Sequence, residues 1–296
     1  MRGSTRIPPT SASAAALWAP LARFIAVEAR IGQWAASGGR LRAWSYEFLR
    51  FGIKQAWACL FGGLMVALII ATTLWYPRGA WLARYDFLFL AALGIQIGML
   101  AFRLETLKEA KVILIFHVVG TIMEVFKTGV GSWIYPEASF FRIGGVPLFS
   151  GFMYASIGSY IARVWHLFDF RFHRHPPLWT VYLLAAAIYL NFYAHHYIYD
   201  FRYVLLAVIV LLLGRTMIDY KVCHRRPMPL LLAAFLVTLF VWIAENVGTI
   251  TKTWLYPHQL TGWQAVSLAK FGSWFLLLFL SYALVAFINQ PKNGPR

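Results

Sequence analysis

The chain has little charge, and most of that charge is of one sign. Charged residues make up 13% of its 296 positions, with 27 lysines and arginines against 11 aspartates and glutamates, while hydrophobic residues make up 60%. An average soluble protein has about 25% charged and about 45–50% apolar residues. This deficit excludes a soluble globular domain and a disordered chain. It predicts an all-α fold, a polytopic helical bundle in a membrane.

Cysteine and short catalytic motifs are also scarce. The two cysteines, Cys59 and Cys223, are far apart in the sequence and indicate neither a disulfide framework nor a metal site. The sequence has no HExxH, CxxC, GxGxxG or GxxxxGK[ST] motif, so we expect no metal and no cofactor. The formal net charge of +16 is distributed between apolar runs rather than gathered in one basic segment, which argues against a nucleic-acid partner.

Long apolar runs predict about eight transmembrane helices in a domain at residues 55–288. Pairing consecutive runs gives four tandem helical hairpins, at about 55–105, 110–168, 176–220 and 228–288. The predicted spans are Trp57–Trp75, Phe87–Phe102, Val112–Phe126, Leu148–Trp165, Leu178–Tyr193, Tyr203–Met217, Leu230–Val247 and Leu268–Ile288.

Lysines and arginines predict the direction of this bundle. With both ends of the chain on one side, that side holds 20 of the 27 basic residues and the other holds 7. Because short loops that carry positive charge stay in the cytoplasm, we expect both termini there, in a bacterial cell membrane. Residues 289–296 would form a cytoplasmic tail. In the N-terminal segment, 1–54, Trp18, Leu21 and Ile25 share one face of a predicted interfacial amphipathic helix; the alternative is a partly disordered tail.

Two stretches of the sequence repeat each other without a gap. EVFKTGVGSWIYP begins at Glu124, and ENVGTITKTWLYP begins at Glu245, an offset of 121 residues. Interfacial aromatic residues followed by a proline would explain the W-x-Y-P part as the end of an outward helix. The glutamates need another explanation, because an ionisable group within a span costs about 2.5–3.5 kcal/mol on insertion scales.

Polar residues around these glutamates form the candidate site. If the second and fourth hairpins face each other across a twofold axis, Glu124 and Glu245 converge on one cavity, and each threonine four residues later can hold its carboxylate. We predict catalytic roles for Glu124, as the acid, and for Glu245, His117 and Lys127. The predicted substrate-binding residues are Thr128, Trp133, Tyr135, Asn246, Thr249, Lys252, Trp254 and Tyr256. The alternative is purely structural: Glu124 pairs with Lys127, and Glu245 with Lys252 or Thr249.

The stretch from His117 to Leu148 resembles a region of the integral-membrane carotenoid hydratase and cyclase-like proteins. The matching positions are His117, Glu124, Thr128, Gly129, Gly131, Trp133, Tyr135, Gly145, Val146, Pro147 and Leu148. The second copy of the repeat, which begins at Glu245, departs from that pattern. GVPL is absent after Pro257, and Lys252 occupies the position equivalent to Gly131. Over most of its length the chain resembles the YoaT-like family of uncharacterised bacterial integral membrane proteins.

The carotenoid-type resemblance implies acid catalysis on an isoprenoid, in which a carboxylic acid protonates a double bond, aromatic rings stabilise the carbocation, and water or an internal alkene captures it. The first functional prediction is therefore a membrane enzyme that hydrates or cyclises a lipid-soluble isoprenoid. The alternative is a proton- or cation-coupled transporter, or a protein that binds a small solute. A structural or accessory membrane protein is a third possibility. The expected partner is a membrane lipid or a lipid-soluble small molecule, and the sequence predicts no oligomeric state.

Overall fold

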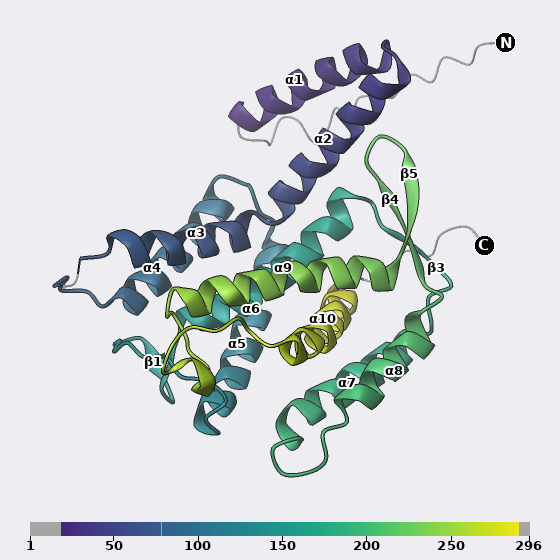
Figure 1. The fold of residues 1–296 in the computed structure, drawn as a ribbon. Helices are drawn as coiled ribbons and strands as arrows, with labels where there is room; N and C mark the ends of the chain where they lie inside the picture. The colour runs from purple at the N-terminus through teal and green to yellow at the C-terminus, as the bar shows by residue number, and fades with distance from the viewer. Residues whose placement is uncertain (1–18, 78, 290–296) are drawn as a thin grey trace.

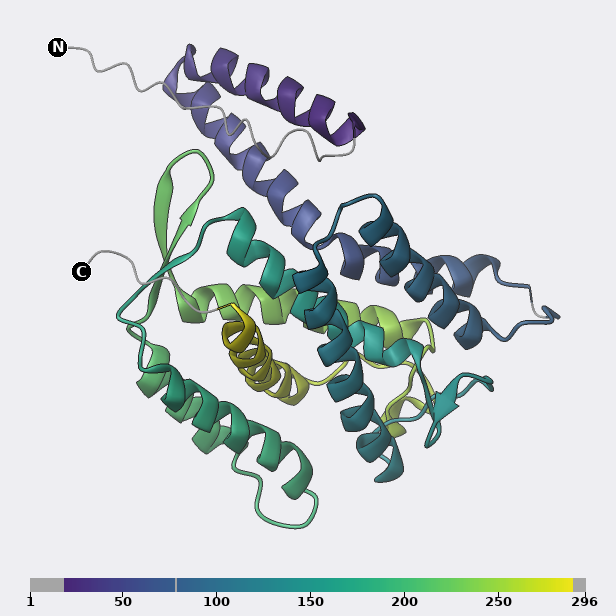
Figure 2. The same ribbon diagram turned by 180° about the vertical axis from the view of Figure 1, so that it is seen from behind.

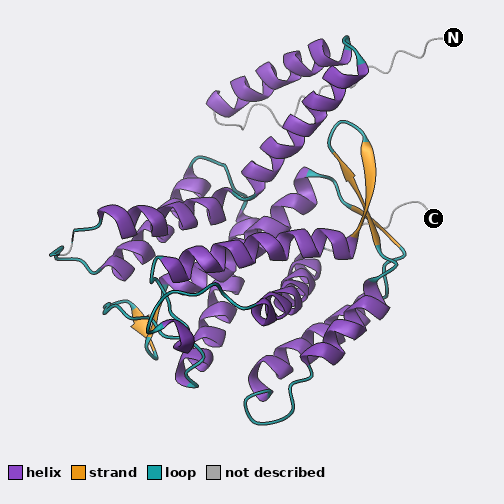
Figure 3. Ribbon diagram, in the orientation of Figure 1, coloured by secondary structure: helices purple, strands orange, loops and turns teal. Residues whose placement is uncertain are grey.

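The structure, a computed structural model, describes residues 19–77 and 79–289 and is dominated by helices (Figure 3). Each of the eight predicted spans overlaps one helix, from α3 to α10, although Trp57–Trp75 begins within α2 and Tyr203–Met217 extends to the first residue of β4. The helices are α1 (Ala19–Ala36), α2 (Arg40–Ala58), α3 (Leu60–Trp75), α4 (Arg84–Ala101), α5 (Leu107–Gly129), α6 (Phe149–Leu167), α7 (Leu178–Ala194), α8 (Arg202–Leu213), α9 (Leu230–Ile250) and α10 (Leu268–Ile288).

Fewer of these helices than predicted meet the requirements for a membrane span. In the described part of the chain, α4, α5, α9 and α10 are long and apolar enough to cross a membrane. The pair α2–α3 counts as a fifth span only if its 68° bend lies within one crossing, and α7 and α8 are apolar but shorter. The fold therefore supports a membrane protein with four or five spans by length and composition. It does not confirm the predicted number of eight.

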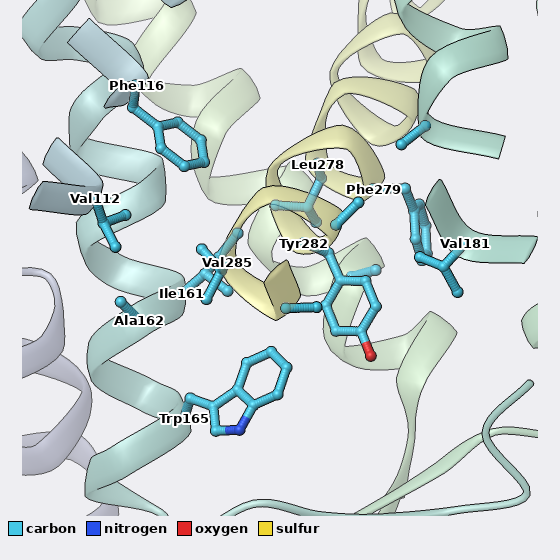
Figure 4. Packing of buried hydrophobic residues seen from close by; sticks show 14 of the residues in the cluster. Val112, Phe116, Ile161, Ala162, Trp165, Val181, Leu278, Phe279, Tyr282 and Val285 are labelled. Carbon is cyan, nitrogen blue, oxygen red and sulfur yellow. The ribbon is translucent and has the colours of Figure 1, made fainter. Parts of the chain in front are cut away.

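Helix α6 lies at the centre of the bundle, in contact with α2, α3, α4, α5 and α10 (Figures 1 and 2). Glycines allow its closest neighbour, α5, to approach: a Cβ added at Gly120 would lie 2.6 Å from the Cβ of Tyr154. Small residues at helix contacts let backbones pack closely in a membrane. Buried side chains of α5, α6, α7 and α10 then form the main core around Trp165 and Tyr282, whose rings stack at 5.7 Å (Figure 4).

Local sequence signals explain where several helices begin. Thr106 caps α5: its hydroxyl accepts the Glu109 backbone N–H at 3.3 Å, and the Glu109 carboxylate accepts the Thr106 backbone N–H at 2.7 Å. This reciprocal arrangement satisfies two N–H groups that a helix end otherwise leaves unpaired. Pro177 and Pro229 directly precede α7 and α9, where a residue without a backbone N–H costs the helix no hydrogen bond.

The helices α1 and α2 form a pair that projects from the bundle (Figures 1 and 2). An ion pair ties α2 to the body of the protein, because the buried Glu47 carboxylate accepts hydrogen bonds from Arg226. Of the face predicted for an interfacial helix, Trp18 and the side chain of Leu21 lie outside the described residues, while Ile25 is exposed. The predicted tail lies outside the described residues from position 290 onward.

Two small antiparallel sheets correct the prediction of an all-α fold (Figure 3). Strands β1 (Arg142–Ile143) and β2 (Val146–Pro147) form a hairpin, and β3 (Arg171–His173), β4 (Met217–Lys221) and β5 (Arg225–Pro229) form a three-stranded sheet. The latter joins the α6–α7 connection to the α8–α9 connection. Its strands are too short to show a two-residue period, and the prolines of β5 are typical of loops or of an edge strand, which β5 is.

Candidate functional site

A cavity of about 1060 Å³ extends through the bundle between α6, α9 and α10, and α2, α3 and α5 complete its wall. Most of its lining is apolar or aromatic. Polar and charged side chains gather at one end, where Glu124 and Glu245 both reach it. Both glutamates therefore line the same cavity. We call this end of the cavity the polar end.

Glu124, on α5, is buried and accepts three hydrogen bonds. Its Oε2 accepts the Trp133 indole N–H and the Tyr135 hydroxyl, both at 2.7 Å, and its Oε1 accepts the Tyr154 hydroxyl at 2.8 Å. Both carboxylate oxygens are thus occupied by donors. Burial and the neighbouring Glu124 raise the pKa of Tyr135, so its phenol remains protonated and donates.

Glu245, on α9, is held by the equivalent side chains but in a different pattern. Its Oε1 accepts both the Trp254 indole N–H, at 3.0 Å, and the Tyr256 hydroxyl. Burial and Glu245 itself raise the pKa of Tyr256, which therefore also remains a donor. No hydrogen bond reaches Oε2 from the described residues. This atom is also not completely buried, so a molecule in the cavity can contact it. One oxygen of Glu245 is therefore free at the cavity.

The backbone around the two glutamates matches at the same offset of 121 residues. Gly131 and Lys252 both adopt a left-handed conformation, at φ +74° and +54°, directly after the helix ends. Ile134 and Leu255 then pair with each other across an antiparallel bridge, with both N–H···O distances at 2.9 Å. A bridge between residues at equivalent positions relates the two short stretches by a local twofold axis. The match concerns these stretches; a repeat of whole hairpins stays a prediction.

Two side chains that the sequence analysis did not assign complete the polar end. Lys270, at the start of α10, lies over the rings of Trp133 and Tyr256, with Nζ 4.4 and 4.7 Å from their centroids. These two rings touch each other edge to face at 6.0 Å, so they connect the two glutamate clusters. Tyr154 comes from the central helix α6. Neither residue lies in the repeated motif, and the sequence showed only an ordinary tyrosine and a lysine beside an apolar run.

Lys127 also lines the cavity but does not pair with Glu124. Its Nζ lies 2.7 Å from His196 Nε2 and 3.3 Å from His195 Nε2, and 4.3 Å from the centroid of the Phe192 ring. The two histidines therefore act as acceptors for Lys127, although this lysine lies within the repeated motif, less than one helical turn from Glu124. His195 is fixed in the tautomer that donates from Nδ1, because that atom lies 2.9 Å from the Asn191 carbonyl.

The remaining predicted residues lie apart from the carboxylates. His117 packs against Phe152, with ring centroids 4.4 Å apart, and is not part of the cavity wall. Lys252 is exposed. The Thr128 hydroxyl has no partner, and the Thr249 hydroxyl bonds the Asn246 carbonyl at 3.2 Å, so neither threonine holds a glutamate as we had expected.

Asn246 has a role in the fold rather than at the carboxylates. Its Oδ1 accepts the Val266 backbone N–H at 2.9 Å, and its Nδ2 donates to the Trp242 carbonyl at 2.8 Å. These bonds fasten the loop after α9 back onto the helix. Throughout residues 19–77 and 79–289, no three histidine, cysteine, aspartate or glutamate side chains are grouped so that they could hold a metal ion.

Comparison with known proteins gives a family but no activity. Residues 47–282 match a family described as "Protein of unknown function (DUF817)". The chain is also 41% identical over 248 residues to a Bacillus subtilis (strain 168) protein described as "Uncharacterized protein YoaT", and the alignment covers 83% of this chain and 93% of that relative. No solved structure matches the chain. The resemblance to carotenoid hydratases finds no support in these comparisons.

Proposed function

The chain belongs to the DUF817 family of proteins of unknown function, and we propose that it is a membrane enzyme that binds a lipid-soluble substrate in its central cavity and protonates it from Glu245. The reaction class we infer is acid-catalysed hydration or cyclisation of an isoprenoid. The sequence analysis gave the role of acid to Glu124. The hydrogen bonds favour Glu245 instead.

The unequal bonding of the two carboxyl groups carries this proposal. Glu124 accepts three donors distributed over both oxygens, an arrangement that suits an ionised carboxylate. Glu245 accepts two donors on Oε1 and none on Oε2. This pattern suits a protonated carboxylic acid. Oε1 would be the carbonyl oxygen that accepts both hydrogen bonds, and Oε2 would be the hydroxyl that can donate its proton. An acid paired with a nearby carboxylate in a different environment is a recurring arrangement in acid–base catalysis.

The shape and lining of the cavity support a lipid-soluble substrate. Its volume of about 1060 Å³ slightly exceeds the range of about 300–1,000 Å³ for small-molecule pockets. Its wall includes Lys270 and Tyr282, which are twelve residues apart on α10, or about 18 Å of helix. A long apolar chain therefore has room beside α10 while its reactive end lies at the glutamates.

Aromatic rings around Glu245 supply what a carbocation needs. Trp254 and Tyr256 contact the carboxyl group directly, and Trp133 packs against Tyr256. The face of an aromatic ring attracts a cation, by about 0.5–2 kcal/mol at each ring. Lys270 already uses the rings of Trp133 and Tyr256 in this way. A positive charge that develops on a substrate near Oε2 would therefore rely on the ring of Trp254, which bonds the same carboxyl group and lines the cavity.

Isotope incorporation tests the proton transfer directly. The full chain, purified in detergent, would be incubated in heavy water with a panel of acyclic polyprenes, and the products analysed by mass spectrometry. We expect deuterium on a carbon that was part of a double bond, and we expect Glu245→Gln to abolish it, because glutamine keeps the size but cannot act as the acid. The exposed Lys252→Gln is the matched control and should retain full incorporation.

Two results would contradict the proposal. Undiminished incorporation with Glu245→Gln would remove Glu245 as the acid. If the wild-type protein incorporates no deuterium but reconstituted vesicles show proton flux that depends on Glu245, the alternative of a proton-coupled transporter is favoured instead.

The orientation in the cell membrane belongs to the same proposal. For the eight spans of the sequence prediction, which place both ends of the chain on one side, we infer that both termini are cytoplasmic and that the α1–α2 pair lies along the cytoplasmic interface. The distribution of basic residues and exposed apolar side chains such as Trp34 and Trp44 support this orientation. A cysteine introduced at Glu137 should react with a membrane-impermeant reagent added outside the cell. Labelling only after the membrane is permeabilised would reverse the orientation.

A further inference from the structure

Basic side chains from three helices and one loop converge on the polar end of the cavity. Lys127 comes from α5, His195 from the connection after α7, Arg202 from the first residue of α8, and Lys270 from α10. Lys127, Arg202 and Lys270 are close enough to repel one another. Segments far apart in the sequence have thus placed three basic side chains around one space in an apolar bundle.

Carboxylates do not neutralise these cations pairwise. Arg202 forms an ion pair with Asp200 at 3.0 Å. By contrast, no carboxylate oxygen among the described residues lies within 4.0 Å of Nζ of Lys127 or Lys270. Lys127 has two imidazole acceptors and Lys270 has two aromatic faces. Ionisable groups in the apolar part of a membrane protein normally have a charged partner, so two lysines with only neutral partners suit the binding of an anionic ligand.

The glutamates do not supply that anion for Lys127. Lys270 is attracted by both Glu124 and Glu245 and repelled by Arg202. Lys127 interacts with Lys270, Arg202 and Asp200 but with neither glutamate. Lys127 and Lys270 therefore both border the cavity without a carboxylate in direct contact among the described residues.

We propose that the substrate is a single-chain lipid with a phosphate headgroup, which binds between Lys127, Arg202 and Lys270. A terminal phosphate has three strong acceptor oxygens, enough to meet three cations that approach from three helices, whereas a carboxylate has two. The apolar chain then lies along α6 and α10, toward the packed side chains of Ile161, Trp165, Leu278 and Tyr282 (Figure 4). This inference rests on the proposed function, since it names the headgroup of the same substrate.

Binding of three probes separates the headgroup from the chain. The full protein in phosphatidylcholine nanodiscs would be titrated with farnesyl phosphate, with farnesol and with inorganic phosphate, and the fluorescence of its cavity tryptophans recorded. We expect farnesyl phosphate to bind at least about tenfold more tightly than farnesol, which corresponds to about 1.4 kcal/mol. Inorganic phosphate should bind more weakly than either. Lys127→Gln should remove most of the preference for the phosphate and leave farnesol binding unchanged.

Controls distinguish lost charge from lost structure. Lys252→Gln removes the same charge from an exposed site outside the cavity wall and should keep the preference. Lys127→Arg retains the charge and should keep most of the preference for the phosphate. Lys270→Gln provides a second test if Lys127→Gln does not fold.

Each other outcome overturns a defined part of the argument. Equal binding of farnesyl phosphate and farnesol rejects the phosphate headgroup but leaves the lipid-binding function intact. Equal binding of farnesyl phosphate and inorganic phosphate rejects the apolar chain. If neither lipid binds to the wild-type protein, the proposed function fails together with this inference.

Discussion

Removing the Tyr154 hydroxyl tests whether Glu124 is held as a buried carboxylate. In Tyr154→Phe, Glu124 Oε1 loses its only hydrogen bond, at 2.8 Å, while Oε2 keeps both of its donors. A hydrogen bond to a charged group contributes about 1.5–3 kcal/mol, against about 0.5–1.5 kcal/mol for one between neutral groups. Because the bond is buried and no other donor replaces it, we expect a loss of unfolding free energy of about 1.5–3 kcal/mol.

Tyr160 provides the control from the same helix. Its hydroxyl donates to the neutral Gln55 side chain at 3.0 Å, and it also lines the cavity. Tyr160→Phe should therefore lower the unfolding free energy by only about 0.5–1.5 kcal/mol. Equilibrium unfolding in mixed detergent micelles measures both changes. A double-mutant cycle of Tyr154→Phe with Glu124→Gln should then show a coupling energy of at least about 1 kcal/mol.

The opposite order would refute this reasoning. If Tyr160→Phe costs as much as Tyr154→Phe, or if the cycle shows no coupling, the bond to Glu124 is not charge-assisted. Glu124 would then not differ from Glu245 in the way that the proposed acid requires.

Three further predictions concern packing, pH and backbone strain. Gly120→Ala should lower the unfolding free energy by about 1–3 kcal/mol, because its new methyl group would lie 2.6 Å from the Cβ of Tyr154; denaturation in micelles measures this. Burial and the charge of Lys127 lower the pKa of His195 below its usual 6.5, so near and below pH 6.5 the unfolded chain binds more protons at this residue than the folded chain does. The melting temperature should therefore fall as the pH drops below about 6.5, and it should fall less steeply in His195→Gln. Lys252→Gly should raise the unfolding free energy by up to about 1 kcal/mol, since glycine tolerates the left-handed φ of +54°, and a melting temperature below the wild-type value would contradict the strain.

The repeated glutamate motif shows how far local sequence information reached. Trp and Tyr follow each glutamate nine and eleven residues later, and the structure brings both onto the carboxyl group in each copy. The sequence analysis recognised these residues but assigned the rings to the substrate and the threonines to the carboxylates. The turn after each helix, with its left-handed residue, folds the aromatic side chains back instead.

The sequence by itself predicted a membrane protein and the approximate positions of helices α3 to α10, because both predictions depend on runs of adjacent apolar residues. The structure was needed to show that Glu124 and Glu245 bind their own aromatic donors, although only a helix end and a short turn separate the residues in each pair. Only the tertiary structure decided that Tyr154 and Lys270 complete the site and that His117 does not. Those contacts join helices through close packing at positions such as Gly120, and one sequence carries no periodic signal for which helix faces meet.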